Sequence, residues 1–105
     1  MTNKIIKFDN GLKYVHIPTK NDMISIGFVV KVGSRDETTK NNGISHFLEH
    51  MLFKGTKKRN TDKLLSELDK FGTSYNAMTS YDYTAYEIHG NKQDAYKLVD
   101  IFIDL

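Results

Sequence analysis

The residue types best suited to chemistry stand together in one segment, as His46, Glu49 and His50. In a helix, which turns by about 100° per residue, these three side chains share one face. Two imidazoles four positions apart reach one metal ion from the same side, and neutral imidazole is a preferred zinc ligand. Glu49 is placed to take a proton from a metal-bound water, whose pKa falls to about 7. The pattern predicts hydrolysis, and peptide bonds are the substrate that it suits best.

The composition of the same segment separates this interpretation from the alternatives. A histidine pair at this spacing also arises by chance on a surface or in a core. An ordinary surface helix carries lysine, glutamate or glutamine, however, whereas His46, Glu49 and His50 are the only ionisable groups between Gly43 and Phe53. The opposite side of the helix is apolar, with Phe47, Leu48, Met51 and Leu52. We expect Phe53 to pack near the site rather than to react.

The other potential ligands are fewer. The chain has no cysteine, which excludes thiol nucleophiles, disulfides and Cys-based zinc fingers, so any metal is held by nitrogen and oxygen. His16 and His89 both lie in segments that favour strands. For each of them we expect a partly buried histidine with a backbone hydrogen-bond partner.

Size and charge limit the function further. The 105 residues suffice for one domain with a single core. Fifteen basic and 13 acidic residues are too evenly balanced for a nucleic-acid or membrane surface, so we expect no nucleic-acid partner. No segment reaches the roughly 18 apolar residues of a membrane span, and Met1–Phe8 lacks the features of a signal peptide or presequence. We therefore expect an intracellular protein, with no compartment specified. The single basic run, Lys54, Lys57, Lys58 and Arg59, is predicted to be a solvated turn.

The first third of the chain favours strands. Asp9-Asn10-Gly11 between Lys4–Phe8 and Leu12–Ile17 predicts a hairpin. Met23–Val32 is almost continuously apolar and β-branched, which predicts a central strand buried on both faces. Gly33 and Ser34 end that strand.

The remaining segments alternate helices with strands. A helix is predicted over Ile44–Phe53, capped by Asn42 and ended by Gly55. A second begins at Thr61 and is closed by Gly72, with an apolar stripe of Leu64, Leu65, Leu68 and Phe71.

Two strands are predicted within Ser74–His89, broken near Ser80-Tyr81-Asp82. A third helix follows from Asn91 and has no stop signal, because Asp104 opposes the helix dipole at its end. Its apolar face is expected to comprise Ala95, Leu98, Val99, Phe102 and Leu105. We infer that packing partners follow this helix.

The motif stands in a context that resembles a known family. His-x-x-Glu-His is the inverzincin motif, and the surrounding sequence resembles the family of pitrilysin, insulin-degrading enzyme and mitochondrial processing peptidase. The similarity extends over nearly the whole chain, and the sequence resembles the processing-peptidase branch most. The matching segments are Asn10–Leu12, Gly33–Glu37, Gly43–Thr56, Lys57–Arg59, Asn76–Ser80 and Tyr83–Tyr86.

The resemblance implies roles for individual residues. His46 and His50 would be Zn²⁺ ligands, and Glu49 would be the general base. Asn76 and Ala77 would lie where an extended peptide substrate adds alongside the sheet; Asn76 as an ordinary strand-end turn residue is the alternative. The fold would be α+β, an antiparallel or mixed sheet with helices packed on one face.

The chain departs from the family in one respect. Members supply a third ligand, a glutamate in an acidic helix well downstream, and they pair this domain with further homologous domains. A catalytic zinc site normally has three protein ligands, so we expect residues 1–105 to be the N-terminal portion of one zinc-peptidase-like domain, inactive alone. The remaining acidic candidates for a third ligand are Asp82, Glu87, Asp94, Asp100 and Asp104.

Two other functions are compatible with parts of the pattern. One is a non-catalytic peptide-binding or assembly subunit, against which the intact His46, Glu49 and His50 argue. The other is a lyase of the S-ribosylhomocysteine-cleaving type, whose metal helix has the same motif. That enzyme relies on a cysteine, which this chain lacks.

Overall fold

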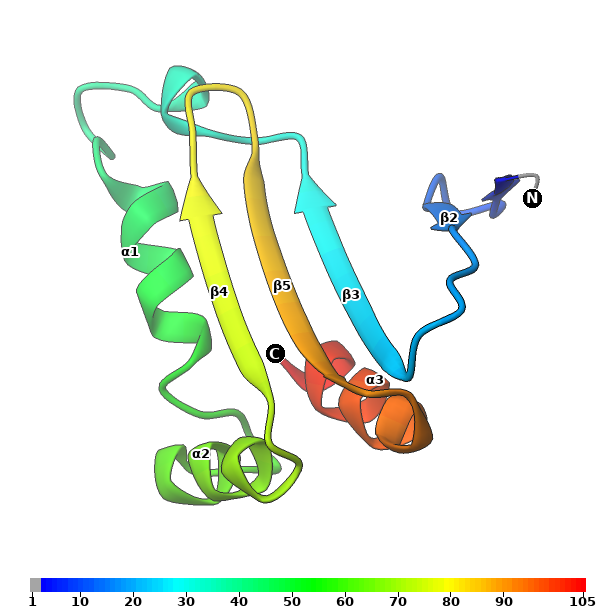
Figure 1. Ribbon diagram of the computed structural model, residues 1–105. Coiled ribbons are helices and arrows are strands. Elements are labelled where there is room, and N and C mark those ends of the chain that lie inside the picture. Colours follow the sequence, from blue (N-terminus) through cyan, green and yellow to red (C-terminus); the bar gives the residue numbers. More distant parts are fainter. Residues whose placement is uncertain (1–2) are drawn as a thin grey trace.

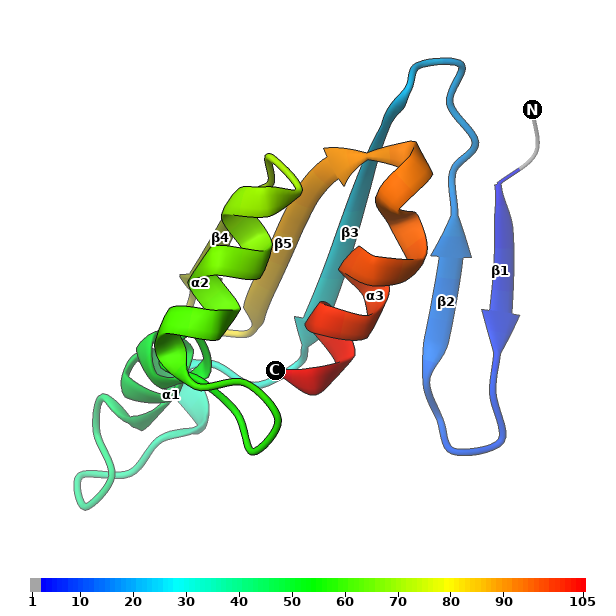
Figure 2. The same ribbon diagram turned by 90° about the horizontal axis from the view of Figure 1, so that it is seen from below.

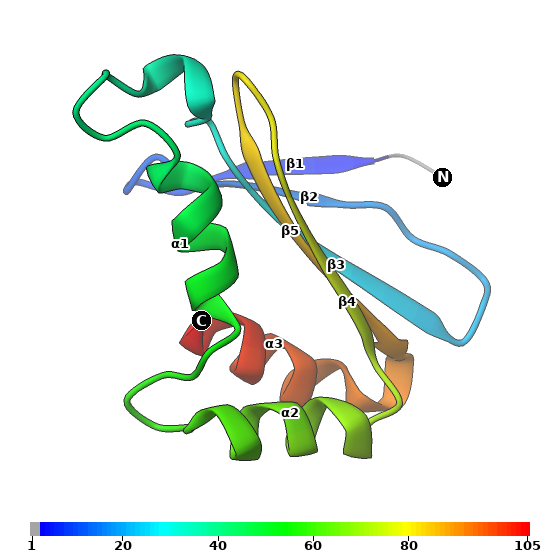
Figure 3. The ribbon, with the colours of Figure 1, turned by 90° about the vertical axis from the view of Figure 1, so that its left-hand side faces the viewer.

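The elements assemble around a three-stranded antiparallel sheet with helices on one side. The computed structural model describes residues 3–105, so the first two residues of the predicted domain lie outside the description. The sheet has the order β3-β5-β4 (Figure 1), and the three helices cover one of its faces (Figure 3). This confirms the predicted α+β class. The strands are β1 (Lys4–Lys7), β2 (Lys13–His16), β3 (Met23–Val30), β4 (Ser74–Thr79) and β5 (Thr84–Asn91). The helices are α1 (Ile44–Leu52), α2 (Thr61–Lys70) and α3 (Ala95–Asp104), with short 3₁₀ turns η1 (Ser34–Asp36) and η2 (Lys92–Asp94).

The predicted hairpin is present as β1–β2. Gly11 adopts a φ of 88°, and the turn closes with a hydrogen bond of 2.9 Å from the Phe8 amide to the Leu12 carbonyl. The hairpin stands apart from α1, at the β3 side of the sheet (Figure 2). His16, on β2, is exposed, so the prediction that it is partly buried is wrong. No described element packs closely enough over β2 to cover it.

The strand β3 does not have the predicted position. It lies at an edge of the sheet, and β5 is the central strand. Ile24 and Ile26 of β3 pack against the core, whereas Phe28, Val29 and Val30 are exposed. A run of apolar residues is buried on both faces only where a layer covers each face, and the described helices cover one face.

The core lies between β5 and the helices α2 and α3. Its centre is formed by five side chains that are at most 2% exposed: Leu64, Leu68, Ile88, Leu98 and Ile101. Leu64 and Leu68 confirm the stripe predicted for α2. The face predicted for α3 is correct at Leu98, Phe102 and Leu105, which contact the core, but not at Val99, which is exposed. Ile101 points inward in its place.

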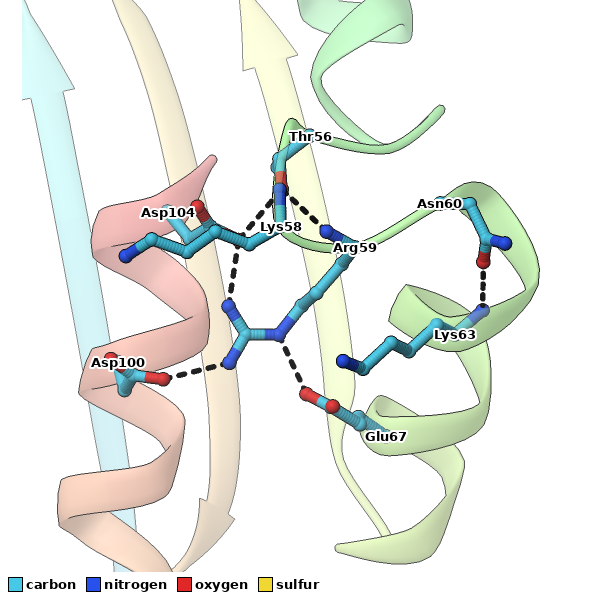
Figure 4. A network of polar contacts seen from close by, with 8 residues as sticks. All are labelled: Thr56, Lys58, Arg59, Asn60, Lys63, Glu67, Asp100 and Asp104. Carbon is cyan, nitrogen blue, oxygen red and sulfur yellow. Dashed lines mark hydrogen bonds and ion pairs between the residues drawn. The ribbon is translucent and has the colours of Figure 1, made fainter.

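Arg59 is not part of a solvated turn, as predicted, but the centre of an ion-pair network (Figure 4). Its side chain is 11% exposed and bonds to Glu67 at 2.7 Å, Asp100 at 2.7 Å and Asp104 at 2.6 Å. A guanidinium has five donors in a fixed plane, which suits several carboxylates at once. Arg59 therefore ties the segment after α1 to both α2 and α3.

The same network explains the anion at the end of α3. The hydroxyl of Thr56 donates to Asp104 at 2.7 Å, beside the guanidinium of Arg59. These two hydrogen bonds lower the pKa of the Asp104 carboxyl. They offset the unfavourable position of a carboxylate at a helix C-terminus.

A close approach at Gly33 joins the end of β3 to the β4–β5 turn. The amides of Ser34 and Arg35 donate to the carbonyls of Ser80 at 3.0 Å and Tyr81 at 2.9 Å. A β carbon at Gly33 would overlap both of those carbonyl groups. Only glycine fits this position without backbone movement.

We expect Gly33→Ala to lower the free energy of unfolding by about 1–3 kcal/mol, the usual cost of overpacking. Gly27→Ala in β3 is the matched control, because a β carbon there would be 4.0 Å from the nearest atom, the Tyr86 carbonyl oxygen. The control should change stability by less than about 0.5 kcal/mol. Urea unfolding measures both, and equal effects of the two variants would contradict the close approach.

Candidate metal centre

The N-terminus of α1 is held by a carboxylate from outside the helix. The predicted cap, Asn42, is wrong, because the N-cap residue is Gly43, with φ of 89° and no side-chain cap of its own. Glu37 accepts hydrogen bonds from the amides of Gly43 at 2.6 Å and Ser45 at 2.9 Å. These two bonds lower the pKa of the Glu37 carboxyl. The helix that bears the motif therefore begins at a position fixed by the preceding loop.

The two histidines of the motif converge. The Nε2 atoms of His46 and His50 are 2.9 Å apart, and their ring centroids are 4.5 Å apart. At this distance the two rings share a hydrogen bond. Two nitrogens bound at about 2.0–2.1 Å to one tetrahedral zinc are separated by about 3.3 Å, so the pair would open by about 0.4 Å to hold the ion. Both side chains are exposed, and donor atoms of His46, Glu49 and His50 all lie within 4.8 Å of one another. The donor set and its spacing fit a zinc ion.

Glu49 is the residue of the motif that contacts the sheet. It is half-buried, and its Oε2 atom accepts a hydrogen bond of 2.5 Å from the hydroxyl of Thr79, on β4. The phenol of Tyr86, on β5, has a raised pKa because it is buried and because it lies near the negative charge of Glu49. The polar face of α1 is thus the face turned toward the sheet.

The apolar face of α1 is exposed among the described residues. Phe47 is 65% exposed, and Leu48 and Met51 are also on the surface. Amphipathic helices usually bury such a stripe, and here the stripe points away from the sheet. The orientation of α1 follows from two contacts with β4. One is the hydrogen bond from Thr79 to Glu49, and the other is the aromatic pair of Phe53 and Tyr75.

The strand β4 presents alternate residues to α1. Tyr75 pairs with the buried Ile88, so Tyr75, Ala77 and Thr79 lie on the helix-covered face. The ring of Phe53 stacks on that of Tyr75, with centroids 4.9 Å apart, which places Phe53 near the site as expected. Asn76 pairs with the exposed Glu87, and its side chain therefore belongs to the opposite face.

A surface hollow of about 240 Å³ separates the end of α1 from β4. Because β4 is an edge strand, the hollow opens beside main-chain groups that β5 does not pair. The structure thus brings Glu49 and His50 together with Asn76 and Ala77, and His46 joins them through His50. The hollow is lined by Glu49, His50, Phe53, Lys54, Tyr75, Asn76 and Ala77.

Four of the five acidic residues considered as a third ligand contact other groups, and the fifth, Asp94, is not part of the converging set. Asp82 pairs with Arg35 at 3.0 Å, and Asp100 and Asp104 pair with Arg59. Glu87 lies 3.6 Å from His89. Within residues 3–105, the only group of three or more potential ligands that converges is His46, Glu49 and His50.

His89 also lies apart from the His46–Glu49–His50 group. Its ring is half-buried, as predicted, and its Nδ1 atom is 2.8 Å from the hydroxyl oxygen of Ser25. The prediction of a backbone partner is wrong, because the cross-strand pairing of β3 with β5 places Ser25 directly opposite.

Three functional contacts were not found from the sequence. They are the cap by Glu37, the hydrogen bond from Thr79 and the proximity of Tyr86. Each joins residues at least six positions apart, so helical or strand periodicity gives no signal for it. Thr79 alone had a local indication, because it follows Ala77 at the strand spacing of two.

The comparisons with known proteins agree with this architecture. Residues 14–105 match the insulinase family, peptidase family M16. The chain is 42% identical over 103 residues to the beta subunit of the mitochondrial-processing peptidase of Dictyostelium discoideum. It is 41% identical over 96 residues to core protein I of the ubiquinol-cytochrome-c reductase complex of Euglena gracilis. These matches cover 97% and 91% of this chain but only 22% and 19% of the relatives.

The fold also matches part of a solved protease. A crystal structure of a protease from Helicobacter pylori superposes with a TM-score of 0.91 at 34% identity, over 98% of this chain and 25% of that one. The chain belongs to the insulinase family of peptidases, M16, and spans about a fifth of the length of the curated relatives it matches.

Family membership alone leaves the activity open. One relative is named as a subunit of a processing peptidase, and another as a core protein of a reductase complex. In both names the protein is part of a larger assembly. No helix within residues 3–105 is long and apolar enough to cross a membrane.

The cap by Glu37 predicts a pH dependence. The folded-state pKa of Glu37 lies below its unfolded value of about 4.3. Its contribution is therefore full above about pH 4.3 and is lost as the pH falls through the lower, folded-state pKa. We expect the difference in free energy of unfolding between the wild type and Glu37→Gln to be largest near pH 7 and to shrink below about pH 4. Urea unfolding at several pH values measures it, and a difference that grows on acidification would contradict the cap.

Proposed function

We propose that this chain supplies the metal-binding helix and the general base of a zinc endopeptidase. His46 and His50 bind Zn²⁺ through the two Nε2 atoms, whose separation of 2.9 Å is the observation that supports the proposal most directly. When bound, zinc lowers the pKa of a coordinated water to about 7 and polarises the peptide carbonyl. A His-Glu-His group beside the unpaired edge of β4 suits that chemistry.

Glu49 is the proposed general base. Its Oε2 atom already accepts the Thr79 hydroxyl, so Oε1 is the atom that we assign to proton transfer. Oε1 takes the proton from the attacking water and returns it to the leaving amine. General acid–base catalysis by a positioned carboxylate typically contributes a factor of about 10²–10⁴ in rate.

The proposed substrate is a peptide in extended conformation. It would add to the free edge of β4 at Asn76 and Ala77, beside the hollow that Glu49 and His50 also line. Because the Asn76 side chain belongs to the opposite face, we assign its role to the main chain. Main-chain recognition tolerates varied side chains in the substrate.

The site needs more than these residues. Two histidines and a base fall one short of the three protein ligands usual in catalytic zinc sites. We propose that residues 1–105 are the N-terminal portion of one zinc-peptidase domain, and that the third ligand, and further homologous domains or a partner subunit, come from outside them. The relatives that bear subunit names are consistent with this. The intracellular location stays a prediction from the sequence.

A non-catalytic assembly subunit is the second candidate. The match to a reductase-complex core protein favours it. The two candidates differ in their need for Glu49, and an experiment can distinguish them. An assembly subunit keeps the edge strand but needs no base at position 49.

In the full-length protein, we expect Glu49→Gln to lower kcat for peptide hydrolysis by about 10²–10⁴ while zinc content is unchanged. His50→Ala should abolish stoichiometric zinc binding, because one ligand is removed. His89→Ala is the matched control, since His89 bonds to Ser25 and not to the motif, and it should retain both zinc and turnover. Metal analysis and peptide cleavage measure these effects; wild-type zinc binding without turnover would favour the assembly subunit.

The isolated 105-residue chain should bind zinc weakly and hydrolyse peptides at the background rate. The physical reason is the missing third ligand, which leaves two imidazoles to hold the ion. Calorimetric titration with Zn²⁺ measures the affinity. Tight 1:1 binding lost in His50→Ala, together with turnover lost in Glu49→Gln, would show instead that these residues contain a third ligand.

A further inference from the structure

We infer that Thr79 is a positioning residue, which holds the carboxylate of Glu49 in the orientation that proton transfer requires. The inference rests on the proposed function and adds to it a residue of β4 outside the His-x-x-Glu-His motif. Its starting point is the hydrogen bond of 2.5 Å from the Thr79 hydroxyl to Glu49 Oε2.

A glutamate side chain on a helix surface does not hold one orientation by itself. Glu49 has three rotatable bonds, and its neighbours on the polar face, His46 and His50, are both exposed. A hydrogen bond from a separate element restricts those rotations. Among the described residues, Thr79 is the side chain that donates to this carboxylate.

Thr79 is itself held firmly. Its β-branched side chain is stiff about χ1, and it is the last residue of β4, paired directly with Thr84 of β5. Thr84 is 5% exposed, and its hydroxyl donates to the carbonyl of Val32 at 2.8 Å. The next residue, Ser80, closes the β4–β5 turn through a bond of 2.9 Å to Tyr83. The donor thus stands on a rigid support, as a positioned site requires.

The two oxygens of the Glu49 carboxylate have different roles in this geometry. A threonine hydroxyl has one hydrogen, which is committed to Oε2. Oε1 keeps its lone pairs for the proton. A threonine at this position therefore orients the base without occupying the atom that reacts.

The alternative is that the hydrogen bond only fastens α1 to the sheet. Phe53 and Tyr75 already provide a second contact between α1 and β4, with centroids 4.9 Å apart. A fastening role predicts a loss of stability and of metal content in a Thr79 variant. A positioning role predicts a loss of kcat with KM and metal content unchanged.

The test compares variants of the full-length protein. Thr79→Val removes the hydroxyl at nearly constant shape and should lower kcat about 10- to 100-fold, the usual effect of a misplaced catalytic group, with KM and zinc content within about twofold. Thr79→Ser keeps the hydroxyl and should restore most of kcat. Thr73→Val is the matched control, because it removes a threonine hydroxyl that donates to the Leu68 carbonyl at 2.8 Å, away from the motif, and should lower stability without lowering kcat.

Two further measurements make the test specific. In the Glu49→Gln background, Thr79→Val should change the residual kcat by less than about twofold, because the two residues act as one unit. In a crystal structure of metal-free Thr79→Val, the Glu49 carboxylate should leave the His46–His50 pair, whereas in Thr79→Ser it should remain.

The outcomes separate this inference from the proposed function. If the wild type cleaves peptides, Glu49→Gln does not, and Thr79→Val keeps kcat within about twofold, the positioning role is overturned and the peptidase stands. A Thr79→Val variant that loses zinc or unfolds, with Thr79→Ser equally affected, also overturns it. If the wild type has no Glu49-dependent turnover, the proposed function fails, and the role of Thr79 fails with it.

Discussion

The contact between α1 and β4 is the constraint on which the candidate site depends. A helix advances about 1.5 Å per residue and a strand about 3.3 Å, so the two meet at few points. Here they meet through the Thr79–Glu49 hydrogen bond and the Phe53–Tyr75 pair. Beside these contacts lies the hollow that residues of both the histidine helix and the edge strand line. A shift of either element would separate the proposed base from the proposed peptide-binding strand.

The rest of the structure supports this contact from two sides. At the start of α1, the carboxylate of Glu37 fixes the first turn through two backbone amides. Beyond its end, Arg59 ties the following loop to α2 and α3 through three carboxylates. The network lies around a guanidinium that is mostly shielded from water, so its bonds are screened less than those of surface ion pairs. A charged group therefore caps the start of the helix, and a second one fixes the loop that follows it, while the apolar face of the helix stays exposed in the described residues.

The orientation of α1 relates structure to function. Within the described residues, its apolar stripe points away from the sheet. Glu49 receives a hydrogen bond from β4, and His50 lines the same hollow as residues of that strand. Such an orientation is expected where a polar group must be held precisely beside a binding strand. It also distinguishes the two candidate functions physically, since an assembly surface needs the edge of β4 but not a carboxylate held against it.

The sequence by itself determined the features that depend on short-range spacing. The period of 3.6 placed His46, Glu49 and His50 on one face, the Asn10-Gly11 turn predicted the hairpin, and the leucine stripe of α2 predicted its buried side. Tertiary structure decided whatever depends on residues distant in the chain. The long apolar run of β3 became an edge strand because β5 pairs between β3 and β4. Arg59 is mostly buried because carboxylates of α2 and α3 converge on it. Glu37, and not Asn42, caps α1. Periodicity predicts which side of an element is apolar. It does not predict which other element packs there, because that depends on the packing of whole elements that are distant in the chain.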